Sequence, residues 1–347
     1  MSDLLIYGAY GYTGRLIVEE CLRRGITPLI AGRNADKTST LADKHGLAYE
    51  VFTVDEKDKL VRWLQQGKVV IHCGGPFMYT NKQMVEACLE TGTHYLDITG
   101  EPQAFERVKS YHDLAIEKGI MLLPGAGFDV IPSDCLANGL AQEMPDATHL
   151  EIAFVSKGGG LSRGTSKTMI ENLGKGRIYR KNHAYTTEPM GESTRLVDFG
   201  DFEQTCVGIS WGDVATAYFS TGIPNIKVFA GTDPKQISRI RMLNKYSWFF
   251  GFKPVKRYLQ RQLDKKPDGP TEAKRLKSST YLWGEVSNGK EKVVKRLKVP
   301  NGYTITADGA VTISEKILRD DYTPGYQTPA MAYGSQLITE LKSTEAL

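Results

Sequence analysis

The sequence is poor in the features that mark secreted, membrane-spanning and nucleic-acid-binding proteins. Its five cysteines are an odd number and widely spaced, mostly in apolar stretches, so we expect buried thiols in a reducing compartment, with neither disulfides nor a metal site. No run of about eighteen apolar residues could span a bilayer. The net charge of +4 is too small and dispersed to predict nucleic-acid binding.

A targeting segment is also missing from the pattern at the start of the chain. The first predicted strand begins at about Asp3, so we expect no signal or transit peptide and a cytoplasmic location. The 347 residues, 41% hydrophobic and 24% charged, are ordinary for a globular protein and are enough for two domains.

Three evenly spaced glycines follow the first predicted strand, Leu4–Tyr7, and precede an amphipathic helix. A bound diphosphate requires a tight turn at the end of the strand, a backbone that comes close to the phosphates, and a helix whose first turn faces the anion. The spacing is GxxGxxG, and its strand-to-helix context favours a dinucleotide-binding loop. The predicted cofactor-binding residues here are Gly8, Ala9, Tyr10, Gly11, Tyr12, Thr13 and Gly14.

The end of the second predicted strand indicates which dinucleotide binds. An NAD enzyme usually has Asp or Glu there to hold the ribose hydroxyls, but this chain reads Gly32-Arg33-Asn34. A guanidinium at Arg33 suits a 2′-phosphate, so NADP(H) is favoured over NAD(H). The alternative is that Arg33 starts a surface helix capped by Asn34.

Strand-like and helix-like segments alternate up to about residue 135, which predicts an α/β, Rossmann-type, doubly wound parallel sheet. Ligands of such sheets bind at the carboxyl ends of the strands. There we expect Gly74, Gly75, Pro76 and Phe77 to contact the cofactor, and Gly100 and Glu101 to contact substrate. For Glu101, a favourable charge at a helix start is an equal alternative.

Five motifs together carry a family resemblance. They are residues 8–14, residues 31–34, Gly75-Pro76-Phe77, the stretch 92–101 (GTHYLDITGE) and the stretch 127–134 (GFDVIPSD). Their order and spacing resemble the saccharopine dehydrogenase-like oxidoreductases, with the trans-acting enoyl reductase-like proteins as the nearest branch. The resemblance implies an NAD(P)-dependent reductase whose first domain holds the cofactor and whose second domain shapes the substrate cleft.

The second domain is predicted to be α+β and to cover about residues 136–319, with 320–347 returning to the first domain. Predicted strands cover residues 148–157, 214–220, 226–230, 279–286 and 292–299. A helix from about Ser162 could bind a substrate anion at Thr165, Ser166 and Lys167, although helix capping is an equal alternative.

An aromatic run at Trp248–Phe252 precedes a basic amphipathic stretch. One interpretation is a weak contact with a membrane surface, or the mouth of a cleft for a lipid-like substrate. The other is a core-packing helix with a solvated basic face. A homodimer is also left open.

The proton donor is the least determined feature. Asp129 and Tyr79 are the catalytic candidates, and no Tyr-x-x-x-Lys pair of the short-chain dehydrogenases occurs. We predict an NADP(H)-dependent oxidoreductase that reduces a C=C, C=O or C=N bond of a small or acyl-chain-bearing substrate. The alternatives are a saccharopine-type amino-acid dehydrogenase, which would need arginines such as Arg163, Arg177, Arg180 and Arg195, and a non-catalytic NADP(H) sensor.

Overall fold

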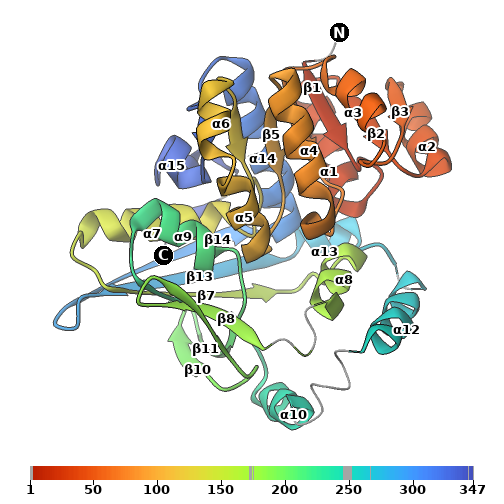
Figure 1. Ribbon diagram of the computed structural model, residues 1–347. Helices are drawn as coiled ribbons and strands as arrows, with labels where there is room; N and C mark the ends of the chain where they lie inside the picture. The colour runs from red at the N-terminus through yellow and green to blue at the C-terminus, as the bar shows by residue number, and fades with distance from the viewer. Residues whose placement is uncertain are drawn as a thin grey trace. The chain divides into compact units, whose positions relative to one another are not determined.

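The computed structural model describes residues 3–171, 174, 176–244, 252–265, 267–342 and 344–346. The chain forms two compact units (Figure 1). Unit 1 comprises Met1–Ile131 and Gly302–Lys342, and unit 2 comprises Pro132–Asn301 and Ser343–Leu347.

Unit 1 is built on a seven-stranded parallel sheet in the order β15-β6-β5-β4-β1-β2-β3. The chain starts at β1 in the middle, builds outward to β3, and then continues from β4 on the other side, so the topological switch lies between β1 and β4. The strands are β1 (Leu4–Tyr7), β2 (Leu29–Gly32), β3 (Tyr49–Val51), β4 (Val69–His72), β5 (His94–Asp97), β6 (Met121–Leu123) and β15 (Gly325–Tyr326). This is the predicted Rossmann-type fold, which is confirmed.

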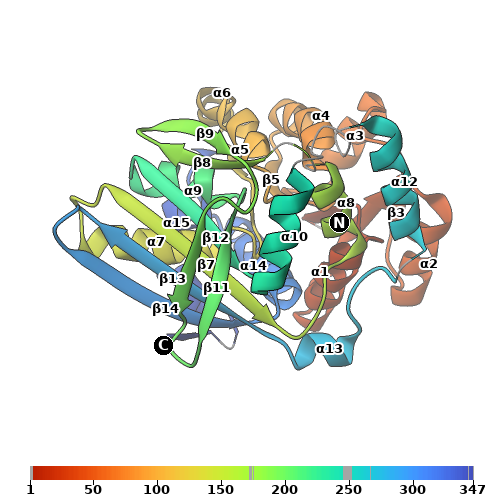
Figure 2. The ribbon, with the colours of Figure 1, turned by 90° about the horizontal axis from the view of Figure 1, so that it is seen from below.

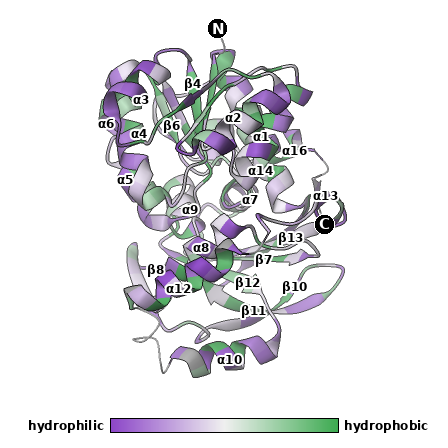
Figure 3. Cartoon of the chain, turned by 90° about the vertical axis from the view of Figure 1, so that its right-hand side faces the viewer, coloured by the Kyte–Doolittle hydropathy of each residue, from purple (hydrophilic) through white to green (hydrophobic). Residues whose placement is uncertain are grey.

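Helices cover both faces of this sheet. Strands β1 and β4 are buried throughout, and Figure 3 shows the hydrophobic colour of β4 and β6 between helices with more hydrophilic outer surfaces. The helices are α1 (Tyr12–Arg23), α2 (Ala35–His45), α3 (Lys57–Leu64), α4 (Phe77–Thr91), α5 (Pro102–Lys109), α6 (His112–Glu117), α14 (Gly302–Leu318), α15 (Pro329–Tyr333) and α16 (Leu337–Glu340).

Helix α14 is where the observed division of the chain differs from the expected one. The second segment of unit 1 begins at Gly302, not at about residue 320. Helix α14 belongs to unit 1 because it packs on α1 through a half-buried ion-pair network: Arg24 bonds to Asp308 and Glu315 on α14. On α14, the buried Gly309 leaves room for Ile131, since a Cβ there would lie 2.4 Å from its Cδ1. The second segment of unit 1 ends at Lys342, and the last residues, Ser343–Leu347, belong to unit 2.

Unit 2 is built on a mixed sheet in the order β10-β11-β12-β7-β13-β14-β16, with β8 paired to β12 and β9. Figure 2 shows its central strands side by side. The strands are β7 (His149–Lys157), β8 (Arg177–Lys181), β9 (Ala184–Glu188), β10 (Thr194–Asp198), β11 (Glu203–Ile209), β12 (Asn225–Gly231), β13 (Ser279–Ser287), β14 (Lys292–Pro300) and β16 (Glu345–Ala346). The helices are α7 (Ile131–Glu143), α8 (Arg163–Glu171), α9 (Asp213–Thr221), α10 (Pro234–Asn244), α12 (Lys253–Asp264) and α13 (Glu272–Leu276). The predicted α+β class is confirmed.

One predicted strand of unit 2 is wrong. Residues 214–220 form most of helix α9, which buries Val214 to Ala217 and ends at Gly222 in the left-handed conformation. The apolar run was too short to separate a buried helix from a strand by its pattern. The flanking glycines, Gly212 and Gly222, and the alanines at 215 and 217 were the signals of a helix.

The five cysteines are free thiols; four are buried and Cys73 is half-buried, as expected from their apolar surroundings. Within the described residues, no helix combines the length and the apolar character that crossing a membrane demands.

Candidate functional site

The glycine-rich loop lies where β1 ends, next to the end of β4. Gly8 has a φ of 77°, and a Cβ on it would lie 2.9 Å from the amide nitrogen of Gly74. A Cβ on Gly14 would lie 2.6 Å from the carbonyl oxygen of Gly8. Backbone atoms cannot move aside as a flexible side chain can, so glycine is required where the loop meets β4 and where α1 meets the loop.

The start of helix α1 suits an anion. Its N-cap is Gly11, which offers no side-chain cap, and the first turn holds no acidic residue. The positive end of the helix therefore meets no carboxylate of its own first turn. Arg15 donates from Nη1 to the carbonyl oxygen of Tyr10 at 2.9 Å, which steadies the loop. These features fit a diphosphate held by main-chain amides.

The end of β2 presents the residues expected to select the dinucleotide. Gly32 lies against Tyr10, since a Cβ there would be 2.6 Å from the tyrosine ring. The exposed Arg33 has no hydrogen-bond or ion-pair partner for its guanidinium in the part of the chain that the structure describes. Asn34 caps α2 by accepting from the amide of Lys37 at 2.9 Å. Arg33 thus fits a 2′-phosphate, whereas the side-chain oxygen of Asn34 already serves the helix.

The loop after β4 is held by a buried histidine. Thr80 donates its hydroxyl to the carbonyl oxygen of Gly74 at 2.8 Å, so His72 must donate from Nε2 to the same hydroxyl at 2.9 Å. Burial lowers the pKa of His72 to about 3 and keeps the ring neutral. The ring lies 5.4 Å from that of Phe77, centre to centre. His72 therefore positions the Gly74–Phe77 loop.

Glu101 is buried at the start of helix α4. Its two carboxylate oxygens accept hydrogen bonds from the amides of Phe77, at 3.0 Å, and Met78, at 3.1 Å. Of the two interpretations left open by the sequence, this favours a charge at a positive helix end. The helix is α4 and not α5, which follows Glu101 in the chain. A substrate role for Glu101 would have to compete with these two bonds.

A second buried acid, Asp97, joins the ends of β5 and β6. Its Oδ1 accepts from the amides of Thr99 and Gly125, each at 2.9 Å, and its Oδ2 accepts from the hydroxyl of Tyr95 at 2.5 Å. Burial raises the pKa of Asp97 to about 6 in spite of these bonds. Asp97 was not among the residues predicted for the site; a carboxylate at the last position of a buried strand was the signal.

Asp129 lies against Gly100. A Cβ on Gly100 would be 2.6 Å from Oδ2 of Asp129, so the glycine leaves room for this carboxyl group. Asp129 is half-buried and has no hydrogen-bond partner among the described residues. Burial, with a smaller contribution from the charge of Glu101, raises the pKa of Asp129 to about 7. A carboxyl group with this pKa can give or take a proton at neutral pH.

Helix α14 holds the turn that carries Asp129. The amide of Phe128 donates to the hydroxyl of Thr306 at 3.0 Å, and a Cβ on Gly127 would lie 2.9 Å from the methyl carbon of Thr306. One turn earlier on α14, the ring of Tyr303 contacts that of Tyr12 at 4.9 Å. Helix α14 therefore connects the glycine-rich loop with the turn of Asp129, a role that the sequence analysis missed.

The other predicted site residues have simpler surroundings. Tyr79 lies in the first turn of α4 and is 66% exposed, which leaves its catalytic role a prediction. Thr165, Ser166 and Lys167 belong to unit 2, in the first turns of α8. Ser162 caps this helix by accepting from the amide of Thr165 at 3.2 Å, so the capping interpretation is observed.

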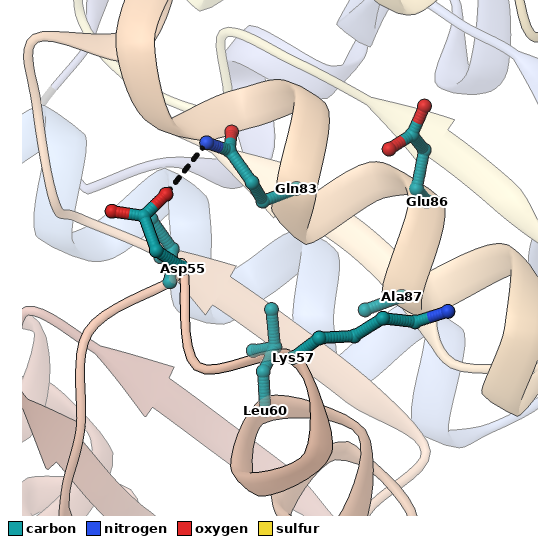
Figure 4. Close-up of a pocket in the computed structure, with 7 residues that line it drawn as sticks. Asp55, Lys57, Leu60, Gln83, Glu86 and Ala87 are labelled. Atoms are coloured by element: carbon teal, nitrogen blue, oxygen red, sulfur yellow. Dashed lines mark hydrogen bonds between the residues drawn. The ribbon is translucent and has the colours of Figure 1, made fainter.

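Unit 1 also has a pocket of about 210 Å³ between the segment after β3 and helix α4 (Figure 4). It is lined by Val54, Asp55, Lys57, Leu60, Gln83, Glu86 and Ala87. Gln83 donates to Asp55 at 3.0 Å across it. None of the predicted site residues lines this pocket, and it is smaller than pockets that hold drug-sized ligands, so it does not mark the cofactor or substrate site.

A known family model matches the first segment of unit 1. Residues 4–123 match the model of the saccharopine dehydrogenase NADP binding domain. The match confirms the resemblance and the cofactor class, NADP(H), that the motifs predicted.

Two relatives and one solved structure extend the comparison. A saccharopine dehydrogenase-like oxidoreductase of Bos taurus is 31% identical over 38% of this chain and 35% of its own length. A Mycobacterium tuberculosis protein, named provisionally as a trans-acting enoyl reductase, is 30% identical over 49% of this chain and 44% of its own. The fold matches the saccharopine dehydrogenase (L-Glu forming) of Saccharomyces cerevisiae with a TM-score of 0.68 at 11% identity, covering both chains fully. The cattle match thus spans about a third of that relative.

Proposed function

We propose that this protein is an NADPH-dependent reductase in which Asp129 exchanges a proton with the substrate. The observation that carries the proposal is the placement of the Asp129 carboxyl group against Gly100 at the carboxyl edge of the sheet, with a pKa raised to about 7. Ligands of doubly wound sheets bind at this edge. The family match to an NADP-binding domain supports the cofactor half of the proposal.

The chain's own residues divide the work. Main-chain amides at the start of α1 bind the diphosphate, and Arg33 binds the 2′-phosphate. Asp129 supplies the proton to the reacting carbon or heteroatom, or takes it in the reverse direction. NADPH supplies the hydride when it is bound. Glu101 and His72 keep the segments around this edge in place through the bonds described above.

The second unit helps to choose between substrate classes. Amino-acid substrates with several carboxylates would need several arginines without partners. Arg180 donates to the carbonyl oxygens of Val214 and His183, and Arg195 pairs with Glu151 and Glu285. Arg163 pairs with Asp268. Three of the four candidate arginines thus serve their own unit, which speaks against a saccharopine-type substrate.

Arg177 is the exception among these arginines. Its Nε donates to Glu188 at 2.5 Å, and both terminal nitrogens have no partner among the described residues. The side chain is nevertheless fully buried and lies flat on Gly208. One enclosed guanidinium does not make a site for a dicarboxylate. We therefore favour a small or acyl-chain-bearing substrate with a C=C, C=O or C=N bond, a choice that the name of the M. tuberculosis relative also supports.

The experiment is a screen of NADPH oxidation against enoyl, keto and imino substrates, with Asp129→Asn as the test variant. With an accepted substrate, we expect kcat to fall about 10²- to 10⁴-fold in the variant, because an amide cannot transfer the proton. The affinity for NADPH should be unchanged, since Asp129 is not among the residues proposed to bind the cofactor.

Asp113→Asn is the matched control. It removes an exposed carboxyl group from the same unit and should leave kcat unchanged. Equal rates for Asp129→Asn and the wild type would refute the role of Asp129. NADPH binding without turnover on any substrate class would refute the reductase and indicate a sensor.

A further inference from the structure

Helix α12 does not pack into a core. None of its side chains that the structure describes is fully buried. One face, which includes Leu259 and Leu263, is half-buried beside helix α8 (Figures 1 and 2). There Lys256 donates to the carbonyl oxygen of Glu171 at 2.6 Å, and Gln260 donates to its carboxylate at 2.5 Å. Helix α12 thus has one half-buried face packed beside α8 and leaves its basic face to solvent.

The opposite face of α12 is exposed and carries cations beside aromatic rings. Arg257, Arg261 and Lys265 recur at four-residue intervals, which places them in one stripe along the helix. Tyr258 lies next to this stripe and is 62% exposed, and Phe252, directly before the helix, is 52% exposed. We call these five residues the α12 stripe.

The three cations of the α12 stripe have no ion-pair partner among the described residues. The surrounding sequence strengthens the charge. Residues 234–277 contain thirteen Lys and Arg but only three Asp and Glu, whereas the rest of the chain, with 31 basic and 37 acidic residues, is net acidic. The modest net charge of the whole protein therefore conceals a strongly basic segment.

We propose that the α12 stripe docks onto an anionic lipid surface. Arginine and lysine gain there from the negative headgroups, while tyrosine and phenylalanine place their rings at the boundary of headgroups and acyl chains. The cations and Tyr258 stand on one face of one amphipathic helix, with Phe252 exposed directly before it, which is an arrangement that interfacial helices use. Of the predicted contact at Trp248–Phe252, only Phe252 belongs to the stripe; residues 248–251 lie outside the described residues.

An anionic surface suits the α12 stripe better than an acidic protein partner or a nucleic acid. The exposure of two aromatic rings to water is unfavourable in free energy, and burial of these rings in a lipid interface removes that cost. A nucleic acid would be expected to track a longer basic groove with several stacking rings. Binding to a nucleic acid is an outcome of the test.

The test is co-sedimentation of the full-length protein with vesicles of phosphatidylcholine alone or with phosphatidylserine. We expect binding only to the anionic vesicles, and its loss at about 0.5 M salt, where charges are screened within a few ångströms. A variant with Arg257, Arg261 and Lys265 changed to Gln should partition roughly a hundred-fold more weakly, from three cations near the surface. Tyr258→Ser should weaken binding at all salt concentrations.

The matched control changes Lys118, Lys181 and Lys290 to Gln. These exposed lysines lie outside α12 and make no ion pair among the described residues, so this variant has the same net charge and should bind like the wild type. Equal loss in both triple variants would show a general charge effect and overturn the proposal. So would the absence of binding to anionic vesicles, or stronger binding to a homopolymeric RNA. Circular dichroism would verify that both variants fold.

Discussion

Arg24 offers the sharpest test of how unit 1 is assembled from two distant parts of the chain. Its guanidinium lies between α1 and α14 and bonds to Glu20 at 2.7 Å, Asp308 at 2.5 Å and Glu315 at 2.6 Å. The side chains of Arg24 and Asp308 are 15% and 5% exposed. Changing Arg24 to Met keeps the packing of the stem but removes the only cation that, among the described residues, pairs with all three carboxylates, and leaves Lys342 near Glu20 and Asp308.

The magnitude follows from the burial of the network. Removing one partner of a buried pair costs about 3–5 kcal/mol, and this network, being partly open to water, belongs at the lower end. We expect the free energy of unfolding to fall by about 3 kcal/mol at pH 7.5. By contrast, Arg23→Met should cost no more than about 1 kcal/mol, because Arg23 is 52% exposed and, among the residues the structure describes, pairs with Glu20 alone.

The loss in Arg24→Met should also depend on pH. Burial raises the pKa of Asp308 to about 6 in the folded protein, against the attraction of Arg24, compared with an ordinary value of 3.8. A raised carboxyl pKa disfavours folding above it, and this penalty shrinks as the pH falls from about 6 towards the ordinary value of 3.8. At pH 5 Asp308 is mostly protonated, one negative charge of the network is gone, and the loss should shrink to about 2 kcal/mol.

Urea unfolding followed by circular dichroism at both pH values measures these differences. Wild type and Arg23→Met serve as references. A loss in Arg24→Met no larger than that in Arg23→Met, or one that grows at pH 5, would refute the assignment of α14 to unit 1 through this network.

Three further predictions concern the site. In Gly100→Ala the new methyl group would collide with the carboxyl group of Asp129 and displace it by about 1 Å, so kcat should fall by roughly 10²-fold while the affinity for NADPH is retained. Steady-state kinetics measures kcat, and fluorescence titration measures the affinity for NADPH. In Glu101→Ala the first amides of α4 lose their acceptors, and thermal unfolding should show a loss of about 1–2 kcal/mol. Because Asp129 donates its proton below a pKa of about 7, kcat for reduction should decline as the pH rises through 7, and an unchanged rate up to pH 9 would contradict its role as the donor.

The fold of unit 1 was readable from the sequence because its elements follow local rules. Buried strands alternate with amphipathic helices, and the glycine-rich loop requires small residues at fixed spacing. The ends of the strands, and with them the neighbourhood of Gly8, Arg33 and Asp129, follow from the parallel topology.

Other features depended on contacts between distant residues and could not be predicted. The attachment of α14 to α1 rests on Arg24 meeting Asp308, which are 284 positions apart. The use of Glu101 to cap α4 required the placement of two loops that no local pattern specifies. The prediction of a strand at 214–220 was wrong. Helix α9 is buried on the sheet of unit 2 and is therefore apolar on several sides, so its sequence lacks the periodicity by which a helix is recognised.

The central claim is that unit 1 holds NADPH through the loop at the start of α1 and selects its 2′-phosphate through Arg33. The most direct measurement is calorimetric titration of NADPH and NADH into the wild type and Arg33→Ala. We predict that the wild type binds NADPH more tightly than NADH by about 10- to 100-fold, the contribution of a charge-assisted guanidinium–phosphate contact, and that the variant loses this preference. Equal preference in both proteins, or no binding of either nucleotide to the wild type, would contradict the claim.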